Sequence, residues 1–347
     1  MQNKHILILT PGFPKDEDDF NCIPPLQEYL IGFKKQFPDS KITVISFQYP
    51  FSNQKYIWQN IQVLPMGGKN IRIKKPFLWL NVVNSANAIN RIKKIDVIHS
   101  FWLGECALLG NYLSKRFSCS HICTLMGQDV KSTNKYLKKL IDKEIKIVAL
   151  SENQANDFTK LTYRKVDEII PWGIDDQPVN DSQRNIDFLG VGSLIPLKNY
   201  SLLIKTVEET KKTFPEVSCK IIGEGPELSK LKLLTKDRGL KKNIEFTGLL
   251  NRKEIFELMQ RSRTFLHPSK FEGFGYVFAE ALVNGMNILS FDVGYAQKHP
   301  KWFIANDDQD FIALSQKLLS SNLDFKSINL FPLSETVEHY ASIYGIS

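Results

Sequence analysis

Residues 267–285 read HPSKFEGFGYVFAEALVNG, and this stretch decides how the chain is interpreted. It opens on the end of an apolar run, Thr264–His267, which predicts a strand, and it closes on a predicted helix over Tyr276–Asn284. The glycines at 273 and 275 let backbone N–H groups approach a ligand closely, and the helix directs the positive end of its dipole at the same place. The sequence therefore predicts a strand–loop–helix unit that binds a polar or anionic ligand.

Two carboxylates lie in this unit. Glu280, in the second turn of the predicted helix, is placed to accept a pair of hydrogen bonds from a vicinal diol such as a ribose. Glu272, in the loop, would reach a different part of the same ligand. The alternative is that both acids are solvated or cap the helix.

Short β-branched runs alternate with amphipathic helical stretches on both sides of this unit, which predicts parallel sheets covered by helices on both faces. In the first half we expect strands at His5–Leu9, Lys41–Ser46, Asp96–His99, His121–Leu125 and Lys146–Leu150, and helices near Pro24–Phe37, Pro76–Lys93 and Leu103–Arg116. In the second half we expect strands at Ile186–Val191, Val217–Ile222, Asn243–Phe246, Thr264–His267 and Asn287–Phe291, and helices at Tyr200–Phe214, Glu227–Arg238, Arg252–Gln260 and Tyr276–Asn284. The fold class is α/β, with two Rossmann-like, doubly wound parallel-sheet domains that face each other across a cleft.

The chain is too long for one domain. We expect an N-terminal domain over 1–174, a polar linker over 175–185, and a second domain over 186–330. Residues 331–347, with a helix at Glu335–Tyr344, are expected to pack back on the N-terminal domain.

A lysine follows the first strand of the second domain, in the segment Gly192–Asn199. Lys198 precedes a predicted helix, so its ammonium group and the helix N–H groups suit a diphosphate. The alternative is an exposed lysine of the kind common near helix starts. Further along, Gly223-Glu-Gly-Pro226 forms a tight turn after a strand, but it lacks the third glycine of a dinucleotide fingerprint.

The composition and the N-terminal sequence indicate the cellular compartment of the protein. Its five cysteines are too scattered for a disulfide framework, the N-terminus has too short an apolar run for a signal peptide, and no run is long enough to span a bilayer, so we expect a cytoplasmic protein.

Residues 1–170 hold 24 Lys and Arg against 15 Asp and Glu, leaving 21 against 22 in the remainder. The basic half could attract an anionic membrane surface or a pyrophosphate-bearing acceptor, or it could simply be solvated helix faces. No motif for nucleic acid accompanies this charge.

The motifs of the second half, taken in order, resemble the retaining glycosyltransferase family 4, which has the GT-B architecture. They are Gly192 to Lys198-Asn199, Gly223-Glu-Gly-Pro226, Ile244-Glu-Phe-Thr-Gly248, Pro268-Ser269, and Glu272-Gly-Phe-Gly275 with Glu280-Ala281. The N-terminal half is more loosely similar. Ser193 stands where many members have an Arg, and Met126 stands where many have a His.

The resemblance implies catalytic roles for Lys198, which would stabilise charge on the donor diphosphate, and for Glu272, which would hold the transferred sugar. It also implies that the donor is bound by Gly12, Gly192, Ser193, Gly248, Leu249, Leu250, Gly273, Phe274, Gly275 and Glu280, with Glu280 on the ribose and 248–250 near the base. His99 and Asp129 are acceptor-side candidates, although His99 could equally be a structural histidine and Asp129 a helix cap. The family implies retention of anomeric configuration, with no cofactor and no metal.

The sequence thus favours transfer of a hexosyl unit from a nucleotide diphosphate sugar to a glycan or lipid-linked saccharide in cell-surface polysaccharide synthesis, by a cytoplasmic enzyme in peripheral contact with the inner face of the membrane. Two alternatives stay open. One is a nucleotide-sugar epimerase of the same architecture, and the other is a non-catalytic subunit that binds a sugar nucleotide.

Overall fold

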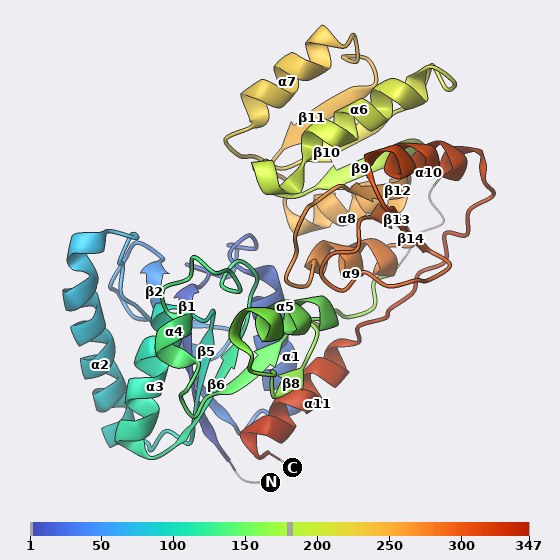
Figure 1. Cartoon of the computed structure of the whole chain (residues 1–347). Helices are drawn as coiled ribbons and strands as arrows, with labels where there is room; N and C mark the ends of the chain where they lie inside the picture. The colour runs from blue at the N-terminus through green and yellow to red at the C-terminus, as the bar shows by residue number, and fades with distance from the viewer. Residues whose placement is uncertain (1–2, 179–182, 347) are drawn as a thin grey trace. The chain divides into compact units, whose positions relative to one another are not determined.

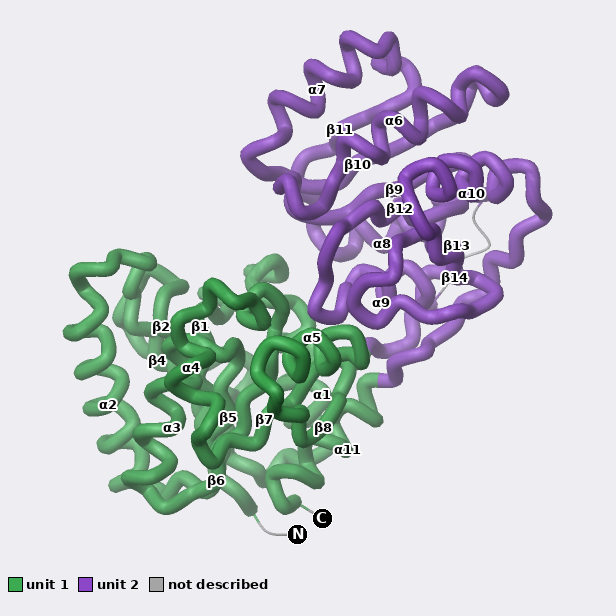
Figure 2. Tube along the Cα trace, in the orientation of Figure 1, with its two compact units in different colours: residues 1–173, 333–347 green, residues 174–332 purple. Residues whose placement is uncertain are grey.

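The chain forms two compact units in the computed structural model, which describes residues 3–178 and 183–346. Unit 1 consists of Met1–Gly173 and Leu333–Ser347, and unit 2 consists of Ile174–Pro332 (Figure 2). These divisions fall within two residues of the boundaries expected at 174 and 331. The described residues of the expected linker, 175–178 and 183–185, belong to unit 2, and its residues 179–182 lie outside the described residues.

The described part of unit 1 is built on an eight-stranded sheet with the strand order β3-β4-β2-β1-β5-β6-β7-β8. All neighbouring strands are parallel except β3 and β4. The strands are β1 (His5–Gly12), β2 (Lys41–Tyr49), β3 (Tyr56–Trp58), β4 (Ile61–Pro65), β5 (Val97–Phe101), β6 (Ser120–Thr124), β7 (Lys146–Ala149) and β8 (Glu168–Ile169). The helices are α1 (Pro24–Gln36), α2 (Lys75–Ile92), α3 (Glu105–Phe117), α4 (Leu137–Leu140), α5 (Glu152–Thr162) and α11 (Leu333–Tyr344) (Figure 1).

The sequence explains the centre of this sheet. β1 lies between β2 and β5, and its residues from His5 to Thr10 are all buried. A strand buried on both faces needs a nearly continuous apolar run, whereas a half-exposed strand alternates apolar and polar residues. Local signals set the helix ends: Pro24 begins α1, and the Ser151 side chain accepts a hydrogen bond from the backbone N–H of Gln154 at the start of α5.

The last helix, α11, completes unit 1 although unit 2 separates it from the rest of that unit along the chain. It packs on α1 so closely that a Cβ built at Gly32 would come within 2.8 Å of the Leu333 side chain. The Tyr344 hydroxyl lies 2.8 Å from the Tyr29 hydroxyl, and Tyr340 contacts the Tyr29 ring. The expected C-terminal helix thus forms part of the core of unit 1.

The described part of unit 2 contains a six-stranded parallel sheet with the order β11-β10-β9-β12-β13-β14. Its strands are β9 (Ile186–Val191), β10 (Cys219–Ile222), β11 (Ile244–Gly248), β12 (Ser262–His267), β13 (Asn287–Ser290) and β14 (Trp302–Ile304). Its helices are α6 (Tyr200–Lys211), α7 (Leu228–Asp237), α8 (Arg252–Arg261), α9 (Tyr276–Val283) and α10 (Asp308–Ser320). Both units therefore have the parallel α/β fold expected from the sequence.

Strand β12 shows how the sheet of unit 2 divides its side chains between two faces. Leu266 belongs to the core cluster that α6, α7 and α10 share with the sheet. The neighbouring Phe265 and His267 contact the Phe278 ring of α9 instead, with ring centroids 6.2 and 4.8 Å apart. This alternation aims His267 towards the helix that follows the glycine loop. In the described ranges, no helix is both long and apolar enough to cross a membrane.

Candidate functional site

Three charged or titratable side chains meet at the carboxyl end of β12. The Lys198 ammonium forms an ion pair with Glu272, and His267 Nε2 lies 2.7 Å from the same Glu272 oxygen, Oε1. All three side chains are largely buried, with 19%, 13% and 3% of the side chain exposed for Lys198, Glu272 and His267. Because Lys198 and Glu272 are 74 residues apart in sequence, the fold alone brings them together.

The protonation of this cluster follows from its contacts. Burial by itself would raise the pKa of Glu272, but the hydrogen bond from His267 and the Lys198 charge outweigh it and lower that pKa to about 2. Burial lowers the pKa of His267, against the opposing effect of Glu272. At neutral pH the site therefore holds an ionised carboxylate, and a neutral imidazole that donates its Nε2–H to it.

Lys198 is held in place by three loops that follow adjacent strands. The loop after β9 is joined to the loop after β10, since Leu194 N–H donates to the Glu224 carbonyl at 2.8 Å, and to the loop after β12, since Lys270 N–H donates to the Leu197 carbonyl at 3.0 Å. Pro196–Lys198 form a 3-10 turn, and α6 begins two residues after Lys198. The lysine thus lies at the edge of the sheet where parallel strands end, as ligand-binding residues do in open α/β folds.

Gly223 is required where two of these loops touch. A Cβ built at this position would lie 2.1 Å from the carbonyl oxygen of Gly192, and its φ of 136° is one that side chains rarely adopt. The predicted donor-binding residues Gly192 and Ser193 are in the loop that Gly223 supports. Ser193 is exposed, so it supplies a hydroxyl and no charge at this point.

The glycine loop of residues 273–275 is fixed by its middle residue. The Phe274 ring is 3% exposed and packs against Tyr295 and Phe331, with ring centroids 5.8 and 5.1 Å away, and its carbonyl accepts a hydrogen bond from Tyr295 N–H. Its side chain therefore anchors the loop and is not available to a ligand. Gly275 has a φ of 85° at the start of α9, so the chain can turn directly into the helix.

Glu280 lies in the second turn of α9 with a cation beside it. Arg252 Nε, at the start of α8, is 3.5 Å from Glu280 Oε1, and both side chains are mostly buried. The Arg252 guanidinium also lies over the rings of Phe256 and Tyr276, 5.0 and 5.9 Å from their centroids. Arg252 and His267 were not among the site residues predicted from the sequence.

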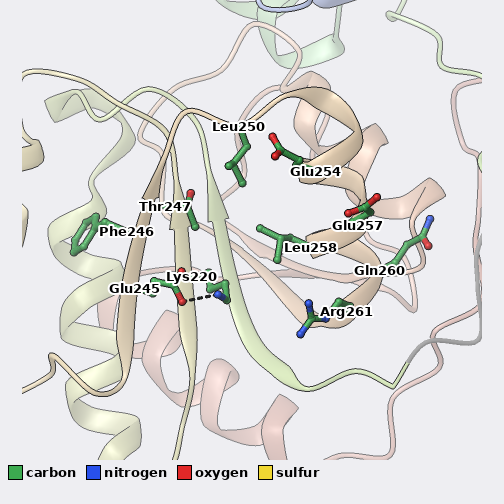
Figure 3. Close-up of a pocket in the computed structure, with 10 residues that line it drawn as sticks. All are labelled: Lys220, Glu245, Phe246, Thr247, Leu250, Glu254, Glu257, Leu258, Gln260 and Arg261. Carbon is green, nitrogen blue, oxygen red and sulfur yellow. Dashed lines mark hydrogen bonds and ion pairs between the residues drawn. The ribbon is translucent and has the colours of Figure 1, made fainter.

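The segment predicted to lie near the base begins at Gly248, the last residue of β11, whose carbonyl accepts a hydrogen bond from Gly223 N–H at 2.9 Å. Leu249 is 61% exposed. Leu250 points into a groove of about 730 Å³ between α8 and the strands β10 and β11 (Figure 3). None of Lys198, Glu272 and Glu280 lines this groove, so it is separate from the cluster.

The three candidates in unit 1 have structural surroundings. His99 is fully buried, and its two ring nitrogens lie 2.6 Å from the Tyr344 hydroxyl and 2.8 Å from Thr124 Oγ1. The Asp129 carboxylate accepts hydrogen bonds from the backbone N–H groups of Leu103, Met126 and Gly127. His99 thus has the structural partners that the sequence left open, whereas Asp129 ties loop backbone together and caps none of the described helices. The expectation that either residue meets an acceptor stays a prediction.

Gly12 ends β1, where a built Cβ would make only ordinary contacts, the nearest at 3.5 Å from Cys22 Sγ. Nothing in the geometry of this residue requires a glycine. In the ranges 3–178 and 183–346 there is no group of three or more His, Cys, Asp or Glu side chains that could hold a metal ion.

Comparison with known proteins places these residues in a family. Residues 174–322 match the model of the family described as glycosyl transferases group 1. An uncharacterized glycosyltransferase of Methanocaldococcus jannaschii is 26% identical over 226 residues, which are 62% of this chain and 61% of that protein. The GtfA subunit of the UDP-N-acetylglucosamine–peptide N-acetylglucosaminyltransferase of Streptococcus parasanguinis is 32% identical over 151 residues, or 43% of this chain and 29% of that protein. The alignments thus span less than two thirds of either relative.

Among solved structures, the Anabaena protein HepE in complex with UDP and glucose aligns over 98% of this chain and 95% of its own, with a TM-score of 0.71 and 18% identity. At this identity the likeness concerns the fold. Lys198, Glu272 and Glu280 all lie within the matched residues 174–322, in the order that the resemblance required. Residues 174–322 of unit 2 thus match the glycosyl transferases group 1 family, and the chain as a whole has the two-domain GT-B fold.

Proposed function

We propose that this chain is a retaining glycosyltransferase that moves a hexosyl unit from a nucleotide diphosphate sugar to a glycan or lipid-linked saccharide. The observation that carries the proposal is the cluster of Lys198, Glu272 and His267, which lies inside the matched family segment. A protein of the same fold was solved with UDP and glucose, which supports a nucleotide sugar as the donor.

The chemistry is a substitution at the anomeric carbon of the donor. The bond from that carbon to the diphosphate oxygen breaks, and a bond to the acceptor oxygen forms on the same face of the sugar. The acceptor proton passes to the departing diphosphate, and the leaving group is a nucleoside diphosphate. Catalysis therefore depends on stabilising negative charge on the diphosphate as the bond breaks.

Lys198 is suited to that task because its ammonium has three N–H donors. One is used by Glu272, which leaves others for phosphate oxygens. Glu272 stays ionised near neutral pH and can accept hydrogen bonds from sugar hydroxyls, while His267 holds the same carboxylate from its other side. Glu280, with Arg252 beside it, would accept the ribose hydroxyls.

In this proposal Lys198 supplies the positive charge near the diphosphate, so no divalent cation is required. Activity is expected to persist after treatment with a chelator, and restoration of activity only by added Mg²⁺ or Mn²⁺ would contradict this part of the proposal.

We propose the chemical class of the acceptor from the net charge of the N-terminal half. Residues 1–170 carry a net charge of +9, from 24 Lys and Arg against 15 Asp and Glu, which suits a phosphate- or pyrophosphate-bearing acceptor such as a lipid-linked saccharide. Synthesis of cell-surface polysaccharide is the process in which we place such a transfer.

The test is binding followed by turnover. The purified chain is titrated with a panel of nucleotide sugars, and Lys198→Ala and Glu280→Ala are measured beside it. We expect saturable binding of one donor, weakened at least tenfold in both variants. No binding of any donor at millimolar concentration would refute the proposal, and unchanged binding in both variants would refute the site.

Product analysis separates transfer from the two alternatives. Incubation without acceptor would convert the donor into its isomer if the protein were an epimerase, and a non-catalytic subunit would bind the donor but yield no product with any acceptor. The anomeric configuration of the product, measured by NMR, decides whether transfer occurs with retention.

A further inference from the structure

The charge of unit 1 is concentrated in one segment of the sequence. Residues 40–95 contain nine Lys or Arg residues and no Asp or Glu. The segment includes β2, β3, β4 and α2, so the excess charge is carried by one part of the unit's fold. A solvated protein surface normally mixes both signs of charge, and a block of one sign favours a partner of the opposite sign.

Exposed apolar side chains lie in the same segment at helical spacing. Ile73, in the 3-10 turn that leads into α2, and Phe77 and Leu80, in the first turns of α2, are 83%, 72% and 57% exposed and are four and three residues apart. The buried face of this helix is formed by other residues, Leu78, Val82, Ala86 and Ile89. The exposed side chains thus form a second apolar stripe, on the face of α2 turned away from the core.

The loop after β2 contributes a fourth exposed apolar side chain. Phe51, after β2, is 62% exposed, and the Lys69 ammonium lies over its ring at 5.7 Å from the centroid. The segment before α2 is tied to the end of β2, because Lys69 N–H donates to the Gln48 carbonyl and Asn70 N–H donates to Gln48 Oε1. Phe51 and the residues leading into α2 therefore share one surface.

Helix stability does not explain the cations here. Arg72 and Lys74 are exposed and stand just before α2, where the helix dipole disfavours positive charge, and the first turn has no acidic residue. The positive end of the helix dipole and the two exposed cations together favour an anion supplied by a partner at this position.

Aromatic residues with polar atoms also lie between α2 and α3. A groove of about 620 Å³ is lined by Trp79 of α2 together with Leu108, Tyr112, Lys115 and Arg116 of α3. The two helices lie side by side at the edge of unit 1 (Figure 1). Trp and Tyr beside Lys and Arg are the residues enriched where proteins meet the headgroup region of a bilayer.

We infer that Phe51, Ile73, Phe77 and Leu80, with the cations Lys69, Arg72 and Lys74, form a docking surface for an anionic lipid bilayer. The apolar side chains enter the boundary between headgroups and acyl chains, and the cations bind lipid phosphates around them. Unit 1 thus lies on the membrane, held by side chains that fold stability does not require. This inference does not rest on the proposed transfer reaction.

The test is co-sedimentation of the full chain with vesicles of phosphatidylcholine, with and without phosphatidylglycerol. We expect binding to the anionic vesicles only, reduced roughly tenfold or more by Phe77→Ser/Leu80→Ser and to a similar extent by Arg72→Glu/Lys74→Glu. Matched controls are available on α7 of unit 2, where Leu233 is 56% exposed and is flanked by exposed lysines. Leu233→Ser and Lys232→Glu/Lys236→Glu should bind as the unchanged chain does.

Several results would overturn the inference. They are absence of binding to both vesicle types, equal binding to both, or an equal loss in the α7 controls. If the unchanged chain is a dimer in sedimentation equilibrium and Phe77→Ser/Leu80→Ser makes it a monomer, the surface joins two copies of the chain instead. We expect the same variants to bind nucleotide sugars as tightly as the chain without substitutions does. If the chain without substitutions binds no donor, the proposed function is refuted, but the vesicle result still tests the docking surface.

Discussion

At the scale of single residues, the Glu272 carboxylate is the centre of the candidate site. Its two partners act differently. The Lys198 ammonium can interact with a ligand phosphate while it pairs with Glu272, whereas the buried, neutral His267 donates a hydrogen bond to the Glu272 carboxylate. Orientation and ionisation of Glu272 can therefore be tested separately.

The low pKa of Glu272 makes stability depend on pH. Because this pKa is held at about 2 in the folded chain, against an ordinary value of 4.5, the stabilisation is complete above about pH 4.5 and is lost as the pH falls towards 2. We expect the difference in unfolding free energy between the unchanged chain and Glu272→Gln to be largest above pH 4.5, with a pH-dependent part on the order of 3 kcal/mol.

Denaturant unfolding of both proteins between pH 2.5 and 7 measures this difference. Glu245→Gln, in the partly exposed ion pair with Lys220, is the control, and its effect should stay within about 1 kcal/mol. A difference for Glu272→Gln that is the same at every pH would show that the pKa of Glu272 is not lowered.

His267 is expected to act as a positioning residue for Glu272. In His267→Leu the carboxylate loses a donor, so its pKa rises, and we expect kcat to fall by roughly 10- to 100-fold and the acidic limb of the pH–rate profile to move to higher pH. His267→Gln retains an N–H donor and should restore most of kcat. A fall in kcat without movement of the acidic limb would indicate a purely structural role.

Arg252 is expected to hold Glu280 for the ribose. Arg252→Ala should weaken nucleoside diphosphate binding by roughly tenfold, because Glu280 loses its neighbouring cation and the α8 start loses its stacking on Tyr276. Isothermal titration calorimetry measures the change. Arg261→Ala, at the exposed end of the same helix, serves as the control, and equal effects of the two substitutions would contradict the assignment.

At the scale of secondary-structure elements, the loops after β9, β10 and β12 form one assembly in which Gly223 is the closest contact. Gly223→Ala should lower the unfolding free energy by roughly 3 kcal/mol and weaken donor binding, because the new methyl group would displace the loop that carries Lys198. Gly239→Ala is the matched control, since Gly239 also has a positive φ but has open space around it, and it should cost about 1 kcal/mol. Equal losses would mean that only backbone strain matters at Gly223.

The sequence predicted elements well where an apolar run stood between clear turn residues. β9 was predicted with its observed bounds, Ile186–Val191, and α9 differs from its prediction by one residue at its end. β3, β8 and β14 were missed because each has only two or three residues, too few for any periodicity. The five-residue strand β4 and the helices α4 and α5 were missed as well. α10 was also missed, although the side chain of Asp307 caps it by accepting from Gln309 and Asp310 N–H, a signal that the sequence does contain.

The site was predicted only in part, for a physical reason. Lys198, Glu272 and Glu280 stand in ordered motifs, but no spacing shows that Lys198 and Glu272 meet, since this depends on β9 and β12 being neighbours in the sheet. His267 and Arg252 gave no signal because their roles come from partners five and twenty-eight positions away in sequence, Glu272 and Glu280. For His99 and Asp129 the sequence left a structural role and an acceptor role open, because a sequence does not show which polar atoms already have buried partners.

At the scale of the whole molecule, unit 1 depends on residues that follow unit 2. The Tyr344 hydroxyl lies beside both the Tyr29 hydroxyl and His99 Nδ1 in the core of unit 1. Tyr344→Phe leaves these buried groups without this partner and should lower the unfolding free energy by about 1–3 kcal/mol. Tyr163→Phe, whose side chain is 95% exposed, should change it by less than about 0.5 kcal/mol.

Thermal unfolding of the two variants measures this difference. Donor binding is a useful second readout, because the candidate site lies in unit 2 and should be unaffected by Tyr344→Phe at temperatures where the chain is folded. Equal unfolding temperatures for Tyr344→Phe and the unchanged chain would show that the hydroxyl does not stabilise unit 1.

The position of α11 in the chain also sets an order for folding during synthesis. Unit 2 is one continuous segment, so it can fold as soon as it has been translated, but α1 must wait for α11 while the ribosome adds residues 174–332. At about 5–20 residues per second, that interval lasts roughly 8 to 30 seconds. During this time the surface of α1 around Gly32 and Phe33 lacks its cover, which makes the nascent first unit a natural client for a chaperone at the ribosome.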